Sequence, residues 1–104
     1  MSNAKFSIGE IVHHKRFNYR GVIFNVDDSM QLSDEWYEQV AKSRPPKDKP
    51  WYHVMVDNQL HTTYVAEQNL ESENNHSPIT HPFIDEYFAE LKDGHYCLKA
   101  KNIN

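Results

Sequence analysis

Short apolar stretches separated by polar turns run through the first two thirds of the chain, and their spacing predicts β-strands rather than long helices. Residues 10–15, 21–26 and 51–56 are rich in β-branched and aromatic side chains. Residues 57–59 predict a turn, so residues 60–65 return as the hairpin partner of 51–56. Because alternate residues of a strand share a face, we expect one core to be lined by Val22, Phe24, Val26, Tyr52, Val54, Val56 and Val65.

Two short helices are predicted between and after these strands. Ser33 can cap a helix over residues 34–41, whose first turn holds two acidic residues. Three prolines in residues 43–50 exclude both helix and strand there. Pro82 opens a second predicted helix over residues 83–91, and Gly94 ends it. Residues 95–101 form either a last short strand or a tail.

Short strands joined by tight turns in a chain of 104 residues predict one mainly β domain, a small, partly open β-barrel with one or two short helices. No apolar run is long enough to span a bilayer, and no apolar region follows Lys5 to make a secretory signal. The single cysteine, Cys97, has no partner for a disulfide within the chain. We therefore expect a reducing, cytoplasmic compartment and no membrane partner.

Charge is unevenly distributed along the chain, whose net charge of −4 excludes a general basic coat for nucleic acid. Residues 1–60 hold eight Lys/Arg and eight Asp/Glu, and residues 61–104 hold three and seven, which together give the 11 and 15 of the whole chain. The cations of the first part gather in two loops, which comprise Lys15, Arg16 and Arg20, and then Lys42, Arg44, Lys47 and Lys49. Aromatic residues Phe17 and Tyr19 interleave with the first group.

Two interpretations of these loops stay open. If they lie together, they form a positive rim on an otherwise acidic protein, with cations for phosphates and aromatic rings for stacking on bases. In the alternative, the cations belong to ordinary solvated loops and Phe17 and Tyr19 pack into the core.

Neither a metal site nor a catalytic group follows from the remaining polar residues. His13 and His14 are adjacent, so on a strand they point to opposite faces, whereas His53 and His61 could approach across a hairpin. No recognised metal-binding motif accompanies them. Cys97 lies two residues after His95, but no glycine-bearing elbow or oxyanion hole goes with it. We therefore predict no enzyme, no metal and no cofactor.

Several motifs together resemble those of the HspQ family, also described as YccV-like and hemimethylated-DNA-binding. They are VHHK at 12–15, YRGVI at 19–23, DEWY at 34–37, PWYHV at 50–54 and YVAEQNL at 64–70. The resemblance covers residues 5–91 and implies a YccV-like, SH3-like β-barrel domain there. Residues 92–104 would then be a C-terminal tail or an edge strand.

The resemblance implies a non-enzymatic, heat-shock-linked protein of the bacterial cytoplasm, with two functions that stay open. The first is binding of hemimethylated DNA, for which we expect the contacts to be Lys15, Arg16, Tyr19, Arg20, Arg44 and Lys47. The second is a role as adaptor and substrate of the Lon protease in the breakdown of denatured proteins, without direct DNA binding. Residues 95–104 would serve there as an exposed recognition tag. The oligomeric state is left open, with a homo-oligomer among the alternatives.

Overall fold

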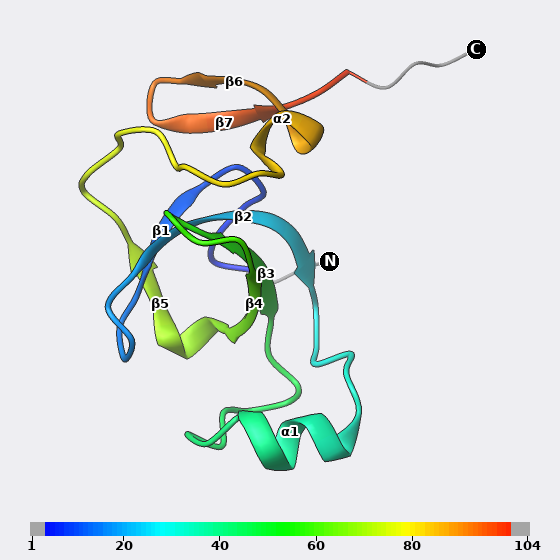
Figure 1. Cartoon of the computed structure of the whole chain (residues 1–104). Helices are drawn as coiled ribbons and strands as arrows, with labels where there is room; N and C mark the ends of the chain where they lie inside the picture. The colour runs from blue at the N-terminus through cyan, green and yellow to red at the C-terminus, as the bar shows by residue number, and fades with distance from the viewer. Residues whose placement is uncertain (1–3, 101–104) are drawn as a thin grey trace.

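The main body of the protein is a curled, five-stranded antiparallel sheet in the order β4-β3-β2-β1-β5 (Figure 1). This computed structural model describes residues 4–100. The strands are β1 (Ile11–His14), β2 (Arg20–Asp27), β3 (Trp51–Val56), β4 (Thr62–Ala66) and β5 (Leu70–Ser72). Helix α1 (Asp34–Val40) follows β2, and the 3₁₀ turn η1 (Glu67–Asn69) joins β4 to β5. The expected mainly β fold is confirmed, and the sheet is not closed because β4 and β5 are both edge strands.

A β-bulge in β2 decides which side chains enter the core. Ile23 pairs with Val54, but Val26 pairs with Tyr52, so one extra residue is inserted between them. Ile23 and Val26 therefore share the face that packs with Tyr52, Val54 and Val65. The expected core was wrong on this point, because strict alternation across the bulge places Val22 and Phe24 on that face instead.

Val22 and Phe24 point to the opposite face of the sheet, where a second layer covers them. This layer is a hairpin of β6 (Phe88–Lys92) and β7 (His95–Leu98), preceded by the single helical turn α2 (Ile84–Tyr87) (Figure 1). Its core is a cluster of buried side chains from both layers, namely Ile11, Val22, Met55, Ile79, Phe88 and Tyr96.

The predicted helix over residues 83–91 is wrong beyond its first turn. Phe88 adopts extended backbone angles, so the chain leaves α2 there and enters β6. Pairing with β7 buries Phe88 and Tyr96 together, a long-range gain that helical spacing does not reveal. Gly94, at φ +79°, makes the β6–β7 turn instead of ending a helix.

Of the two alternatives for the C-terminal residues, the strand is observed over residues 95–98. Tyr96 is buried there, and its hydroxyl accepts a hydrogen bond from the Ile79 N–H at 2.8 Å. The end of the expected recognition tag, residues 101–104, lies outside the described residues. Across residues 4–100, no helix has the length and apolar character needed to cross a membrane.

Candidate functional site

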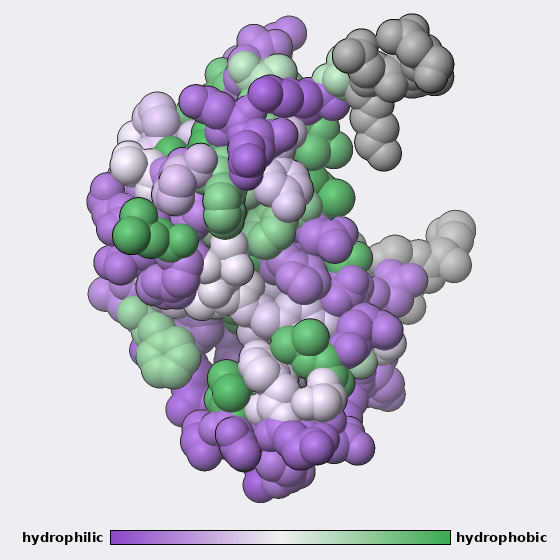
Figure 2. Space-filling view, turned by 45° about the vertical axis from the view of Figure 1, so that its right-hand side comes forward, coloured by the Kyte–Doolittle hydropathy of each residue, from purple (hydrophilic) through white to green (hydrophobic). Residues whose placement is uncertain are grey.

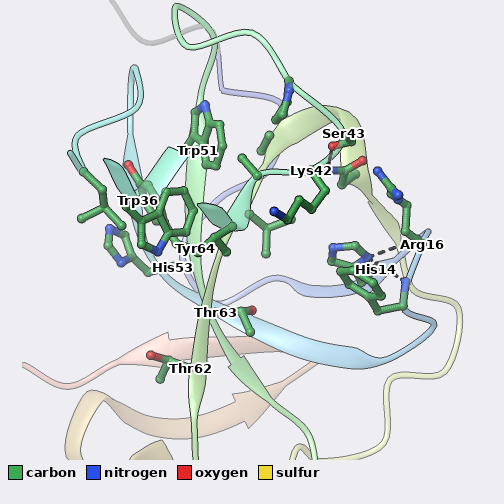
Figure 3. Close-up of a pocket in the computed structure, with 18 of the residues that line it drawn as sticks. His14, Arg16, Trp36, Lys42, Ser43, Trp51, His53, Thr62, Thr63 and Tyr64 are labelled. Atoms are coloured by element: carbon green, nitrogen blue, oxygen red, sulfur yellow. Dashed lines mark hydrogen bonds between the residues drawn. The ribbon is translucent and has the colours of Figure 1, made fainter. Parts of the chain in front are cut away.

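A groove of about 540 Å³ opens at the end of the sheet that is next to α1 (Figure 3). One wall is the loop between β1 and β2, and the other is α1 with the loop that follows it. The consecutive residues 62–66 of β4 line the groove between these walls. In Figure 2 hydrophobic side chains at the lower part of the molecule form separate patches around a hollow instead of one continuous face.

The α1 wall is held in place by hydrogen bonds at its start and in the loop after it. The Ser33 hydroxyl accepts from the Trp36 N–H at 3.1 Å, which confirms the expected helix cap. Tyr37 is buried and donates its hydroxyl proton to the Pro45 carbonyl at 2.6 Å. The indole of Trp51 donates to the Pro46 carbonyl at 3.0 Å. Together these contacts fix both α1 and the proline-rich loop against β3.

An aromatic cluster forms the surface of this wall. Trp36 meets Trp51 and Tyr64 edge-on, with ring centroids 5.9 Å and 5.6 Å apart. Trp51 is only 1% exposed, whereas Trp36 and Tyr64 are half-buried. The groove is therefore lined by aromatic rings whose inner neighbours hold them in position.

Asp27 anchors this cluster from behind. The Tyr64 hydroxyl donates to Asp27 Oδ2 at 2.7 Å and accepts from the Gln31 N–H at 3.0 Å. His53 Nε2 hydrogen-bonds with the same carboxylate oxygen at 3.1 Å. Burial, with the Asp27 hydrogen bond, raises the pKa of Tyr64 above its usual value, so its phenol stays protonated.

The β1–β2 loop is organised around His14. Its Nδ1 accepts hydrogen bonds from the backbone N–H groups of Arg16 and Phe17, at 3.1 Å and 3.0 Å (Figure 3). Its ring lies 4.8 Å from that of Phe17 and 5.0 Å from that of Tyr19. Burial, with the nearby Arg16 cation, lowers the pKa of His14, so the ring is neutral and Nδ1 is free to accept.

His13 faces the opposite side of β1, as expected, and its pKa is shifted in the opposite direction from that of His14. Its two ring nitrogens hydrogen-bond with Asn18 Oδ1 at 2.6 Å and with Glu71 Oε2 at 2.7 Å. These two acceptors raise its pKa, because both favour the doubly protonated ring. These contacts place His13 at the base of the same loop, where its protonated form is favoured.

The structure divides the six residues expected to contact DNA. Arg16 and Tyr19 line the groove, and Lys15 is exposed beside Arg16. Tyr19 is half-buried and shares a hydrogen bond with the Thr63 hydroxyl at 2.7 Å, which links the loop to β4. Within residues 4–100, neither Lys15 nor Arg16 forms an ion pair.

The other three expected residues are engaged with protein groups. Arg44 pairs with Glu38 at 2.7 Å, and Lys47 pairs with Asp34 at 3.1 Å. Arg20 does not line the groove. It pairs with Asp57 at 2.9 Å and donates to the carbonyls of residues 75 and 77, so it ties the 73–80 segment to the sheet.

The expected set omitted most of the groove residues, among them Trp36, Lys42 and Tyr64. Lys42 lies on the α1 side, across the groove from Arg16 (Figure 3), and forms no ion pair in the described part of the chain. A signal for this wall was present in the sequence. Trp36 and Val40 lie four residues apart, which places them on one face of α1. The structure adds that Val40 is 54% exposed. An apolar stripe that remains exposed marks a binding surface.

The other polar candidates do not assemble into a site. In the part of the chain that the structure describes, no three metal-ligating side chains come together. The cross-strand partner of His53 is Tyr64, not His61. His95 Nε2 hydrogen-bonds with the Ile8 carbonyl at 3.0 Å instead of pairing with Cys97.

The groove and the β6–β7 end of the molecule differ in their unpaired charged residues. Unpaired cations stand at the groove, while exposed Asp85, Glu86 and Glu90 belong to α2 and β6 at the opposite end (Figure 1). The groove therefore offers unpaired cations to a polyanion in spite of the net charge of −4 and of the exposed acidic residues on α1.

Two comparisons with known proteins bear on this site. A family model described as hemimethylated DNA-binding protein YccV like matches residues 4–95. F-box only protein 21 of Homo sapiens is 33% identical over 98 residues, and that of Mus musculus is 32% identical over the same length. The alignments cover 92% of this chain but 15% and 16% of those proteins, so the chain spans about a sixth of the length of these curated relatives.

Proposed function

Because the chain belongs to the YccV-like family, we propose that it binds hemimethylated DNA with the groove end of the molecule. The family is a DNA-binding family. The observation that supports this surface is the position of two unpaired cations, Arg16 and Lys42, on opposite walls of one aromatic groove. Cations contact phosphates, and aromatic rings offer faces for bases.

Each of the six expected residues takes a distinct part in this proposal. Lys15 and Arg16 contact phosphates directly, together with Lys42. Arg44 and Lys47 flank this surface and exchange their carboxylate partners for phosphates, so they contribute less. Tyr19 lines the groove, and Arg20 has a structural part away from it, where it ties the 73–80 segment to the sheet.

The proposal is tested by the salt dependence of DNA binding. Each of Arg16→Ala and Lys42→Ala removes one phosphate contact, so affinity falls and the slope of log K against log salt drops by about 0.9. Fluorescence anisotropy with hemimethylated, fully methylated and unmethylated duplexes measures both quantities. Lys92→Ala, an exposed cation on β6, is the matched control and leaves them unchanged. Affinities and slopes equal to those of the wild type in both groove variants would refute this surface.

A second candidate function is supported by the edge position of β4. The chain would act as an adaptor that presents extended polypeptides to the Lon protease. An edge strand has unpaired backbone groups that can add a strand from another chain, and here that edge borders an apolar groove.

In a purified degradation assay, the protein would accelerate Lon cleavage of a denatured substrate. Thr63→Lys places a charged side chain in the groove and should abolish this acceleration. Equal cleavage with and without the protein rejects this function.

A further inference from the structure

The groove is too small for a DNA duplex. Its volume of about 540 Å³ lies in the range of small-molecule pockets. A DNA duplex is much larger than such a pocket, since its major groove alone is about 12 Å wide. A base stacked in a duplex also has both faces covered by its neighbours. The part of a DNA strand that fits between the two walls is therefore a single base that has left the stack.

We propose that the groove binds one base extruded from the duplex, with Arg16 and Lys42 on the phosphates that flank it. This inference rests on the proposed function and names the part of the DNA that enters the site. It assigns a separate task to the aromatic walls, which phosphate contacts alone leave without a role.

Aromatic side chains stand on both walls, which suits a flat ligand. Phe17 and Tyr19 come from the β1–β2 loop, and Trp36 and Tyr64 lie on the other side. Phe17 is 71% exposed although it stacks on His14, so a ring of this size is available to a ligand. Stacking of a base on an aromatic side chain contributes roughly 1–3 kcal/mol.

The backbone of β4 supplies hydrogen-bonding groups between these walls. The Glu67 N–H donates to the Pro50 carbonyl at 3.1 Å, and the Asp57 N–H donates to the Arg20 carbonyl at 2.9 Å. Hydrogen-bonded and non-hydrogen-bonded residue pairs alternate along an antiparallel ladder. Counting from these two bonds along β3, the pair His53–Tyr64 is a non-hydrogen-bonded pair. The N–H and C=O of Tyr64 therefore point away from β3, towards the open edge. One donor beside one acceptor matches the polar edge of a base.

Charge favours a nucleotide over an uncharged or cationic ligand. Arg16 and Lys42 are exposed on opposite sides of the groove, and neither has a carboxylate partner among residues 4–100. An extruded nucleotide carries one phosphate on each side of its sugar. Two separated cations are therefore complementary to it in number and sign.

The test compares an intact hemimethylated duplex with one in which the methylated base, or its unmethylated counterpart, lies opposite an abasic site. Extrusion from a paired site costs a few kcal/mol, and the abasic partner removes part of that cost. The wild type should bind one of the unpaired duplexes at least about tenfold more tightly than the intact duplex, a ratio that corresponds to about 1.4 kcal/mol.

Variants at Trp36 separate stacking from general DNA binding. Trp36→Ala should lose the gain on the unpaired duplex and keep most of the affinity for intact DNA, which depends on phosphates. Trp36→Phe should keep the gain but lose the quenching of indole fluorescence that a base stacked on Trp36 produces. Tyr87→Ala, an exposed aromatic residue on α2, is the control and should behave as the wild type. Thermal melting confirms that each variant is folded.

Three results would overturn the inference, and they differ from one another. Equal affinity for paired and unpaired duplexes, with DNA binding intact, places the base outside the groove and leaves the proposed function standing. Absence of binding to every duplex refutes the proposed function itself. Binding of a fluorescent extended peptide that DNA does not displace assigns the groove to a polypeptide.

Discussion

Two adjacent histidines on β1 show how single residues determine the state of the groove loop. His14 is buried and accepts two backbone hydrogen bonds through Nδ1, so it must be neutral to hold residues 16 and 17. His13 faces two oxygen acceptors and is stabilised as a cation. The same residue type is therefore held in its neutral form at one position and is favoured in its protonated form at the next.

We expect these two histidines to affect stability in opposite directions as the pH changes. The pKa of His14 is lowered from 6.5, so its contribution is complete above pH 6.5 and is lost as the pH falls below that value. The pKa of His13 is raised from 6.5, so its contribution is present below pH 6.5 and is lost as the pH rises through the raised value. In the wild type the two effects partly cancel.

His14→Asn keeps a side-chain acceptor but removes the titrating ring. The free energy of unfolding of this variant should therefore be higher at acidic pH than at neutral pH, because protonation of His13 still stabilises the folded state. His13→Asn should show a steeper loss towards acid than the wild type. Urea unfolding at several pH values between about 5 and 8 measures the three profiles. Parallel profiles would contradict the assigned protonation states.

At the scale of elements, the β6–β7 hairpin acts as a cover for one face of the sheet. β7 donates two hydrogen bonds to the segment before β1, from the Tyr96 N–H to the Gly9 carbonyl at 2.8 Å and from His95 Nε2 to the Ile8 carbonyl at 3.0 Å. Gly9 has φ +94°, and a Cβ there would lie 2.1 Å from the Tyr96 carbonyl oxygen. This close approach requires glycine at that position.

Tyr96→Phe should lower the free energy of unfolding by about 1–3 kcal/mol, because the variant leaves the buried Ile79 N–H without its acceptor. The ring itself still fills its place in the second core. Tyr87→Phe is the matched control, since Tyr87 is 40% exposed, and its hydroxyl should be dispensable. Chemical denaturation of both variants measures the difference. Equal stabilities would show that solvent replaces the lost acceptor at Ile79.

The same elements show how far sequence patterns reach. The strands around residues 11–14, 20–27 and 51–56 were predictable because their residue types and local alternation already favour extended chain. The bulge after Ile23 and the change from α2 to β6 were not, because both depend on pairing with strands that are distant or later in the chain. A side chain's face depends on this register.

The groove was only partly predictable for a related reason. Arg16 and Tyr19 belong to one local cluster of cations and aromatic residues, so the sequence alone marks them. Lys42 and Trp36 come from α1 and its end, and only the folding of the proline-rich loop brings them opposite Arg16. Arg20 looks equivalent to Arg16 in the sequence, but its partner Asp57 lies 37 residues away.

For the molecule as a whole, the unpaired groove cations and the acidic residues of α2 and β6 make DNA binding depend on which end approaches. The molecule measures 37 × 35 × 25 Å, and α2 and β6, which carry acidic residues, lie at the end away from α1 (Figure 1). At physiological ionic strength charges are screened over about 8 Å, but at 0.01 M salt the distance grows to about 30 Å. The acidic end therefore acts on an approaching DNA molecule only at low salt.

Glu86→Gln combined with Glu90→Gln should leave the Kd for DNA unchanged at about 0.15 M salt and should raise the association rate constant at about 0.01 M salt. Both residues are exposed and lie outside the groove. Stopped-flow fluorescence at the two salt concentrations measures the rates. A change in Kd at the higher salt concentration would indicate that DNA contacts the hairpin end.

The open edge of β4 also matters when no ligand is present. Residues 62–66 contain no charged side chain and no proline, which are the features that normally prevent edge strands from pairing with other copies. The other edge, β5, is three residues long and carries Glu71, so it is better protected. Self-association in concentrated solution should therefore begin along β4. A ligand bound in the groove covers the same strand, so the bound protein should self-associate less than the free protein.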